Sequence, residues 1–192
     1  MSIKERRERE RAERERLIVT AARELAEAEG WDAVTTRRLA AEIEYSQPVL
    51  YSHFKGKDAI MVAVAVQGFA EMAGELRAAG TSAPGPREAL AAVAEAYAAF
   101  ADRRPALYDA MFVRAVDLPF ATPEAPAALR EAFASLHRVI EPLAGDEDPD
   151  ALTETFWSGL HGLITLMRSG RLRRESHDRR LALLIGHFSP PA

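Results

Sequence analysis

Hydrophobic residues recur along the chain at spacings of three and four, which is the periodicity of an amphipathic helix and not of a strand. Alanine, a strong helix former, is abundant, and no run of β-branched residues is bounded by turn residues. The first apolar stripe ends before Gly30 and comprises Leu17, Ile18, Ala21, Ala22, Leu25 and Ala26. We therefore predict an all-α fold of about nine helices.

Capping and breaking residues give the bounds of the later helices. Thr35 or Thr36 can cap a short helix, and after a break at residues 44–45 a second one begins near Ser46, with Pro48 in its first turn. A longer helix is expected from residue 57 towards 79, followed by a linker-like break at 80–86. Further helices are predicted near 87–102, 105–115, 126–141, 149–168 and 175–188.

Residues 35–54 have the pattern of a helix-turn-helix. An inner apolar face, which needs the preceding helix as a lid, is formed by Leu39, Ala40, Ile43, Tyr45, Val49, Leu50 and Phe54. The remaining polar side chains are types that satisfy phosphate oxygens and base edges: Thr36, Arg37, Ser46, Gln47, Tyr51, Ser52, His53, Lys55 and Lys57. A second helix of about seven residues is long enough to enter a major groove.

Specific residues in this segment carry a family resemblance. Gly30, the threonine pair 35–36, Leu39-Ala40 and the run LYSHFKGK at 50–57 resemble the DNA-binding domain of the tetracycline-repressor (TetR) family over about residues 18–65. The resemblance implies that Thr36 caps the first helix of the pair and touches phosphate. It also implies that Ser46 and Gln47 face base edges and that Pro48 contacts a thymine methyl group.

The same resemblance places Tyr51, His53 and Lys57 on backbone phosphates. Arg37 is a candidate for a bidentate guanine contact, and a phosphate contact is equally plausible. Each residue also has a plainer role open to it: Tyr51 can pack, His53 can be a surface histidine, and Arg37 and Arg38 can simply be solvated.

The turn between the two short helices departs from the family pattern. Glu44 stands where the family has glycine, and Tyr45 where it favours valine or isoleucine. If the backbone at 44 is left-handed, a non-glycine residue there costs on the order of 1 kcal/mol.

The N-terminal segment 1–16 interleaves seven cations with five anions. It is expected to be a solvated extension of the first helix, with an arm in the minor groove of DNA as the alternative. Residues 1–60 carry 12 cations and 12 anions, so a DNA-binding face requires segregated charges and a dimer that occupies two half-sites.

The C-terminal part contains FWSGLHGLI at residues 156–164, which resembles the WHG motif of one class of TetR ligand-binding domain. Gly159 and Gly162 weaken the helix and are typical of a close helix–helix crossing. We expect the last two helices to form a four-helix dimer interface with the second copy, through Gly159, Gly162, Leu163, Leu181 and Leu184.

Aromatic and polar residues on the middle and later helices are candidates for an apolar effector pocket with polar handles: Tyr97, Phe100, Tyr108, Met111, Phe112, Phe133, His137, Trp157 and His161. A plain core role is the alternative for each, and His161 can be a buried, hydrogen-bonded histidine.

Composition excludes several classes of site. The 192 residues include no cysteine, so disulfides and thiolate metal sites are ruled out. The five histidines lack metal-ligand spacing, no catalytic motif is present, and we expect neither metal nor cofactor. The charged first sixteen residues are unlike a signal peptide, and the apolar run 59–70 is too short to cross a bilayer, so a cytoplasmic protein is expected.

Together these features predict a DNA-binding domain over 1–60 and a ligand-binding and dimerisation domain over 61–192. The hypothesis is a homodimeric repressor that binds a pseudo-palindromic DNA operator and is released by a small apolar or amphipathic effector. Two rivals remain open: a helical dimeric protein-interaction module without DNA binding, and a helical enzyme that uses His161.

Overall fold

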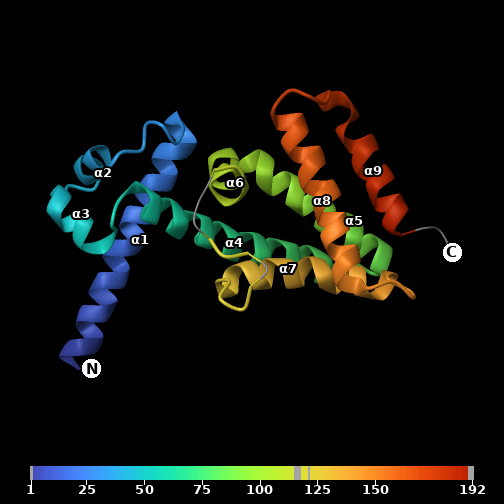
Figure 1. Ribbon diagram of the computed structural model, residues 1–192, viewed down its shortest axis with the longest axis horizontal. Coiled ribbons are helices and arrows are strands. Elements are labelled where there is room, and N and C mark those ends of the chain that lie inside the picture. Colours follow the sequence, from blue (N-terminus) through green and yellow to red (C-terminus); the bar gives the residue numbers. More distant parts are fainter. Residues whose placement is uncertain (1, 115–117, 121, 190–192) are drawn as a thin grey trace. The chain divides into compact units, whose positions relative to one another are not determined.

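A computed structural model describes residues 2–114, 118–120 and 122–189, and every regular element in these ranges is helical, which confirms the predicted class (Figure 1). The α-helices are α1 (Ile3–Glu29), α2 (Thr36–Glu42), α3 (Gln47–His53), α4 (Lys57–Thr81), α5 (Pro86–Arg103), α6 (Pro105–Phe112), α7 (Ala127–Ile140), α8 (Pro149–Arg168) and α9 (His177–Phe188). Short 3-10 turns occupy Glu141–Leu143 and Arg174–Ser176. The end predicted for α6 at residue 115 and the chain end at 190–192 lie outside the described residues.

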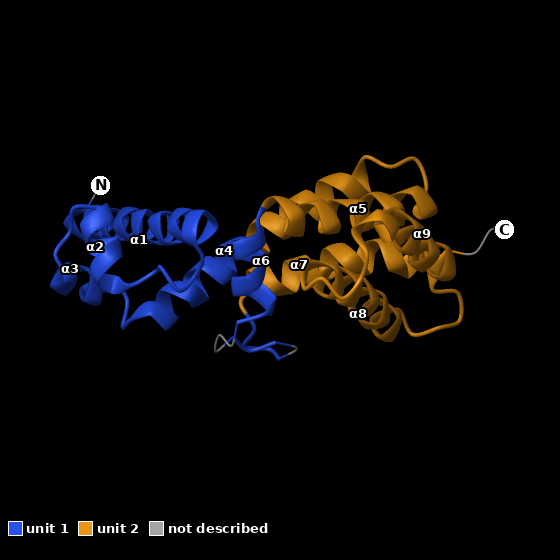
Figure 2. Ribbon diagram, turned by 90° about the horizontal axis from the view of Figure 1, so that it is seen from above, with its two compact units in different colours: residues 1–68, 104–125 blue, residues 69–103, 126–192 orange. Residues whose placement is uncertain are grey.

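The chain forms two compact units (Figure 2). The first comprises residues 1–68 and 104–125, and the second comprises 69–103 and 126–192. The single helix α4 therefore begins in one unit and ends in the other.

In the first unit, α1 covers the pair α2 and α3, as the apolar pattern predicts. Ile18, Leu39 and Leu50 are fully buried at the centre of this packing. Two apolar side chains were placed wrongly by the pattern: Leu17 and Val49 are exposed, because each lies on the helix face turned away from this core.

Helix α6 also belongs to the first unit and packs against α1. The Glu27 carboxylate accepts hydrogen bonds from the backbone N–H groups of Ala106 and Leu107, both at 3.0 Å. The buried Trp31 indole donates to the Ala106 carbonyl oxygen at 2.8 Å. Two N–H groups of the first turn of α6, which have no acceptor within their own helix, are thus satisfied by a side chain of α1.

The second unit is built by α5, α7, α8 and α9 with the end of α4, and it buries Tyr97, Phe100 and Phe156. The linker predicted at 80–86 is shorter than expected, because α4 continues to Thr81. A Cβ atom at Gly80 would lie 3.1 Å from Val139 and 3.3 Å from Val93, so Gly80 is a packing position and not part of a linker.

The apolar stretch in α4 is also longer than the sequence suggested. Among the described residues, α4 is the one helix long and apolar enough to cross a membrane by length and composition. Half of its most apolar window is buried inside the protein.

Candidate nucleic-acid interface and C-terminal polar cluster

The turn that joins α2 and α3 has a defined helix-ending geometry. Glu44 has φ = 55°, the left-handed conformation that glycine adopts most readily. The Tyr45 N–H donates to the Ala40 carbonyl at 2.8 Å, and the Glu44 N–H donates to Ala41 at 3.3 Å, which is the Schellman pattern. Glu44 therefore adopts the backbone geometry that a glycine would have at this turn, and α2 and α3 keep the helix-turn-helix arrangement.

The exposed face of α3, together with its N-cap Ser46, carries four of the nine predicted DNA contacts. Ser46, Gln47 and Pro48 are exposed, and so is Tyr51, at 52%. The Tyr51 and Thr36 hydroxyl oxygens lie 3.3 Å apart, so α2 and α3 present one hydroxyl pair. The predicted cap at Thr36 is wrong, because the side chain of Thr35 accepts the hydrogen bond from Arg38 N–H. Thr36 is therefore left to face Tyr51.

Two of the predicted phosphate ligands are engaged inside the protein. The His53 side chain is 7% exposed, and its Nδ1 lies 3.4 Å from a carboxylate oxygen of Glu15 on α1. The Lys57 ammonium donates to the Trp31 carbonyl oxygen at 2.5 Å. His53 and Lys57 thus brace α3 and the start of α4 against α1 and the following loop, whereas Lys55 is exposed.

The adjacent arginines of α2 differ in environment. Arg38 makes a two-pronged ion pair with Glu29, with its Nη1 at 2.7 Å from one carboxylate oxygen. The hydrogen bond from Arg38 lowers the pKa of the Glu29 carboxyl. Arg37 is exposed and has no ion pair among the described residues. Of these two arginines, Arg37 is thus the one that can meet a guanine or phosphate without first giving up an ion pair within the described residues.

In the second unit, three predicted effector residues come together between α5 and α8. The Trp157 indole donates to the Tyr97 hydroxyl oxygen at 3.1 Å, and the Trp157 and His161 ring centroids lie 6.1 Å apart. His161 Nε2 lies 3.3 Å from the Thr165 hydroxyl, and burial lowers the pKa of the imidazole. These four residues are named the polar cluster. Thr165 was missed from sequence, although its position four residues after His161 places both on one helix face.

The other predicted effector residues are not part of this cluster. Phe100 is buried beside it on α5, while Phe133 and His137 lie on α7, with His137 3.3 Å from Asp150. Tyr108, Met111 and Phe112 belong to the first unit, so the predicted set is divided. A surface pocket of the second unit shares no residue with this set and is lined by Leu76, Arg77, Gly80, Thr81, Pro86, Ala89, Ser135, Arg138, Val139 and Pro142.

The predicted dimer residues divide into inward and outward positions. A Cβ at Gly159 would lie 2.9 Å from the Leu184 side chain, so this glycine permits α8 and α9 to approach within the chain, and Leu181 is buried there. Gly162 has open space around its Cβ position, and Leu163 is half-buried. Within the described residues, no group of three or more His, Asp or Glu side chains could hold a metal ion.

Comparison with known proteins decides the family. Residues 18–64 match the family model described as bacterial regulatory proteins, tetR family. Residues 90–188, just over half of the chain, match the tetracyclin repressor-like, C-terminal domain. The chain belongs to the tetR family. It is therefore a DNA-binding transcriptional regulator, and the resemblance stated from the sequence is confirmed.

Individual relatives of this tetR-family regulator agree. An HTH-type transcriptional regulator of Mycobacterium tuberculosis is 32% identical over 155 residues, covering 80% of this chain and 69% of the relative. The class D tetracycline repressor protein of Escherichia coli is 44% identical over 50 residues, 26% of this chain and 23% of that protein.

Two solved structures show the same fold. A protein from Rhodococcus sp. RHA1 superposes with a TM-score of 0.75 at 24% identity, over 91% of this chain and 92% of that one. A bacterial regulatory protein in the tetR family, also from Rhodococcus RHA1, superposes with a TM-score of 0.64 at 22% identity, over 93% and 98% of the two chains.

Proposed function

We propose that this regulator is a repressor that binds a pseudo-palindromic operator as a homodimer and leaves it when a small effector binds. The observation that carries the proposal is the exposed face of α3, where Gln47, Pro48 and Tyr51 stand on a seven-residue helix and Ser46 precedes it as the N-cap. Serine, glutamine and tyrosine side chains suit base edges and phosphates, and Arg37 and Lys55 add exposed cations on either side. We place the protein in the cytoplasm, where bacterial DNA lies.

Dimerisation follows from the size of the DNA-reading surface. One short helix reads few base pairs, so useful affinity requires two half-sites about one helical turn apart. On α8, Gly162, Leu163 and Leu166 share one face through their spacing of three and four residues. Leu166 is 41% exposed, and Leu183 on α9 is 67% exposed. Two such helices in each copy would bury these leucines in a four-helix interface.

The polar cluster supports an effector of apolar or amphipathic character. The Tyr97 hydroxyl, the Trp157 indole and the His161 imidazole are the few polar groups beside the apolar side chains of α5 and α8, which is the composition of a small-molecule site. An effector releases DNA only if it binds the DNA-incompetent conformation more tightly than the competent one. Helix α4, which starts in one unit and ends in the other, is the proposed lever.

Selection of duplexes from a random-sequence library by the wild-type protein tests the DNA-binding proposal. The expected product is a site with two inverted half-sites, bound by two copies of the chain with a steep salt dependence. Gln47→Ala should relax base preference within each half-site, and Tyr51→Ala should weaken binding to all sequences. Gln67→Ala, the same substitution on α4, is the matched control and should change neither.

The rival hypotheses make different predictions for the same protein. If no duplex is enriched and binding is insensitive to salt, the helical pair is a protein-interaction module. If the dimer turns over a small molecule and His161→Ala abolishes that turnover, the C-terminal unit is an enzyme. A small molecule found by native mass spectrometry in the purified dimer, which also releases the selected duplex, supports the effector proposal.

A further inference from the structure

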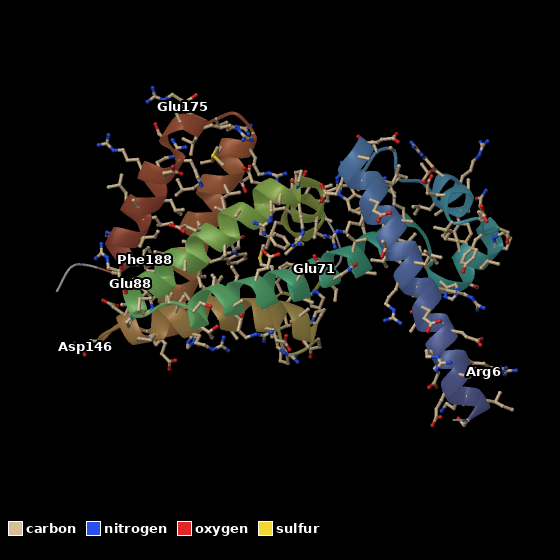
Figure 3. All side chains as sticks on the ribbon, turned by 180° about the vertical axis from the view of Figure 1, so that it is seen from behind. Arg6, Glu71, Glu88, Asp146, Glu175 and Phe188 are labelled. Carbon is tan, nitrogen blue, oxygen red and sulfur yellow. The ribbon has the colours of Figure 1, made fainter. Side chains whose placement is uncertain are left out.

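The N-terminal arm, defined as residues 3–16, is a regular helix with a complete cap. Ser2 accepts a hydrogen bond from the Glu5 N–H at 3.2 Å, and the Glu5 carboxylate accepts one from the Ser2 N–H at 2.8 Å. This reciprocal pair satisfies two N–H groups at the start of α1. The arm continues α1 without a break and projects past α2 and α3, with Arg6 near its far end (Figure 3).

Charges on the arm are segregated by the register of α1. Ile18, Ala21 and Leu25 form the stripe by which α1 packs on the helix pair, at spacings of three and four residues. Continuing that spacing back from Ile18 leads to a row of cations without an anion: Arg14, Arg11, Arg7 and Lys4. The apparently mixed sequence thus carries a cationic row on the same side of α1 as the packed stripe.

The members of this row differ in how they are paired. Lys4 and Arg11 form exposed ion pairs with the glutamates four residues later, at 3.8 and 2.8 Å. Arg7 and Arg14 have no carboxylate partner among the residues that the structure describes. Exposed pairs of this kind contribute little to stability, so a phosphate can replace the glutamate.

The arm starts where the DNA-reading helix ends. The contact of His53 with Glu15 places the C-terminal end of α3 beside residue 15 of α1. From there, residues 4–14 extend about 15 Å along the helix axis. That length corresponds to about four to five base-pair steps of duplex measured along the DNA axis, at roughly 3.4 Å per step.

We propose that the cationic row of the arm, Lys4, Arg7, Arg11 and Arg14, binds DNA backbone phosphates that flank the half-site read by α3. The inference rests on the DNA binding of the family and of α3. It assigns to the arm an affinity that does not depend on base sequence and that requires DNA beyond the recognised base pairs.

Two lengths of duplex test this contact. One carries the site selected by the wild-type protein, trimmed at its ends, and the other extends that site by about ten base pairs, one helical turn, on each side. Dissociation constants are measured over a series of KCl concentrations. The wild-type protein should bind the extended duplex more tightly and with a steeper salt dependence than the trimmed one.

The paired substitution Arg7→Gln/Arg14→Gln should reduce that gain and lower the salt slope on the extended duplex by about 1.8 per protomer, two phosphate contacts at 0.9 each. The control is Arg9→Gln/Arg16→Gln, which removes the same charge at the same spacing of seven residues on the opposite face of α1. Arg7→Lys/Arg14→Lys should keep the wild-type slope, which separates the effect of lost charge from that of lost helix.

The results separate this inference from the proposed function. If the trimmed site is bound but both double variants lower the slope equally, only net charge matters and the arm contact is refuted. It is also refuted if neither variant changes the slope. If the wild-type protein binds no duplex, the proposed function itself fails.

Discussion

Glu44 gives a direct test of the turn between α2 and α3. A non-glycine residue in the left-handed conformation costs roughly 1–2 kcal/mol, and Glu44 has φ = 55°. Glycine removes this strain, but its greater conformational freedom in the unfolded chain lowers the stability by about 0.5–1 kcal/mol. The Glu44 side chain is exposed and has no ion pair among the described residues, so Glu44→Gly should stabilise the first unit by about 0.5–1 kcal/mol.

Urea unfolding of the first unit measures this change. Trp31 is buried in that unit. When every variant also carries Trp157→Phe, Trp31 is the one remaining tryptophan, so the fluorescence reports on the first unit alone. In thermal unfolding followed by the same fluorescence, the same stabilisation should raise the melting temperature of this unit of about 90 residues by about 2–8 °C. Glu42→Gly is the matched control, because the same side chain is removed from the helical end of α2, where glycine should cost about 1 kcal/mol. If both variants shift stability in the same direction, strain at residue 44 is refuted.

Three further predictions follow from other positions. Gly68→Ala should destabilise the first unit by about 1–3 kcal/mol in urea unfolding, because the new Cβ would lie 2.6 Å from the Met111 sulfur, whereas Gly74→Ala, with open space, should be neutral or stabilising. Burial lowers the folded-state pKa of His161, so the unfolded state binds more protons at this residue as pH falls from 7 to 5, and the unfolding free energy of the wild type should decrease over that range. His161→Gln should remove this decrease, and parallel pH profiles of the two proteins would contradict the prediction. Gly162→Ala should weaken dimerisation in sedimentation experiments without unfolding the monomer, and an unchanged dimer would remove Gly162 from the interface.

The helices and the DNA-reading pair were predictable because their information is local. Apolar spacing, the threonine cap at 35, Pro48 and the residues at 50–57 act within one or two turns of the chain. The comparison of Glu44 with the family's glycine showed that the turn was unusual, but it left open whether the backbone there is left-handed, and the structure shows that it is.

Contacts between distant residues were not predictable in this way. No local pattern pairs Glu15 with His53 or Trp31 with Lys57, so two residues expected at phosphates were found bracing the fold. The predicted effector residues fall in two different units for the same reason. Helical spacing of aromatic residues shows which face of a helix is apolar, but not which other helix packs against that face.

The hydrogen bonds from α6 to Glu27 have a consequence for exchanging parts between relatives. Helix α6 completes the core around α1, although it begins about fifty positions beyond the end of the helix-turn-helix at residue 54. In a chimera joined after residue 68, α1 would pack against the α6 of another protein. The Glu27 carboxylate and the Trp31 indole would then depend on the backbone of that protein for their hydrogen bonds. Joining this DNA-binding unit to another C-terminal domain therefore requires that α6 be transferred together with residues 1–68.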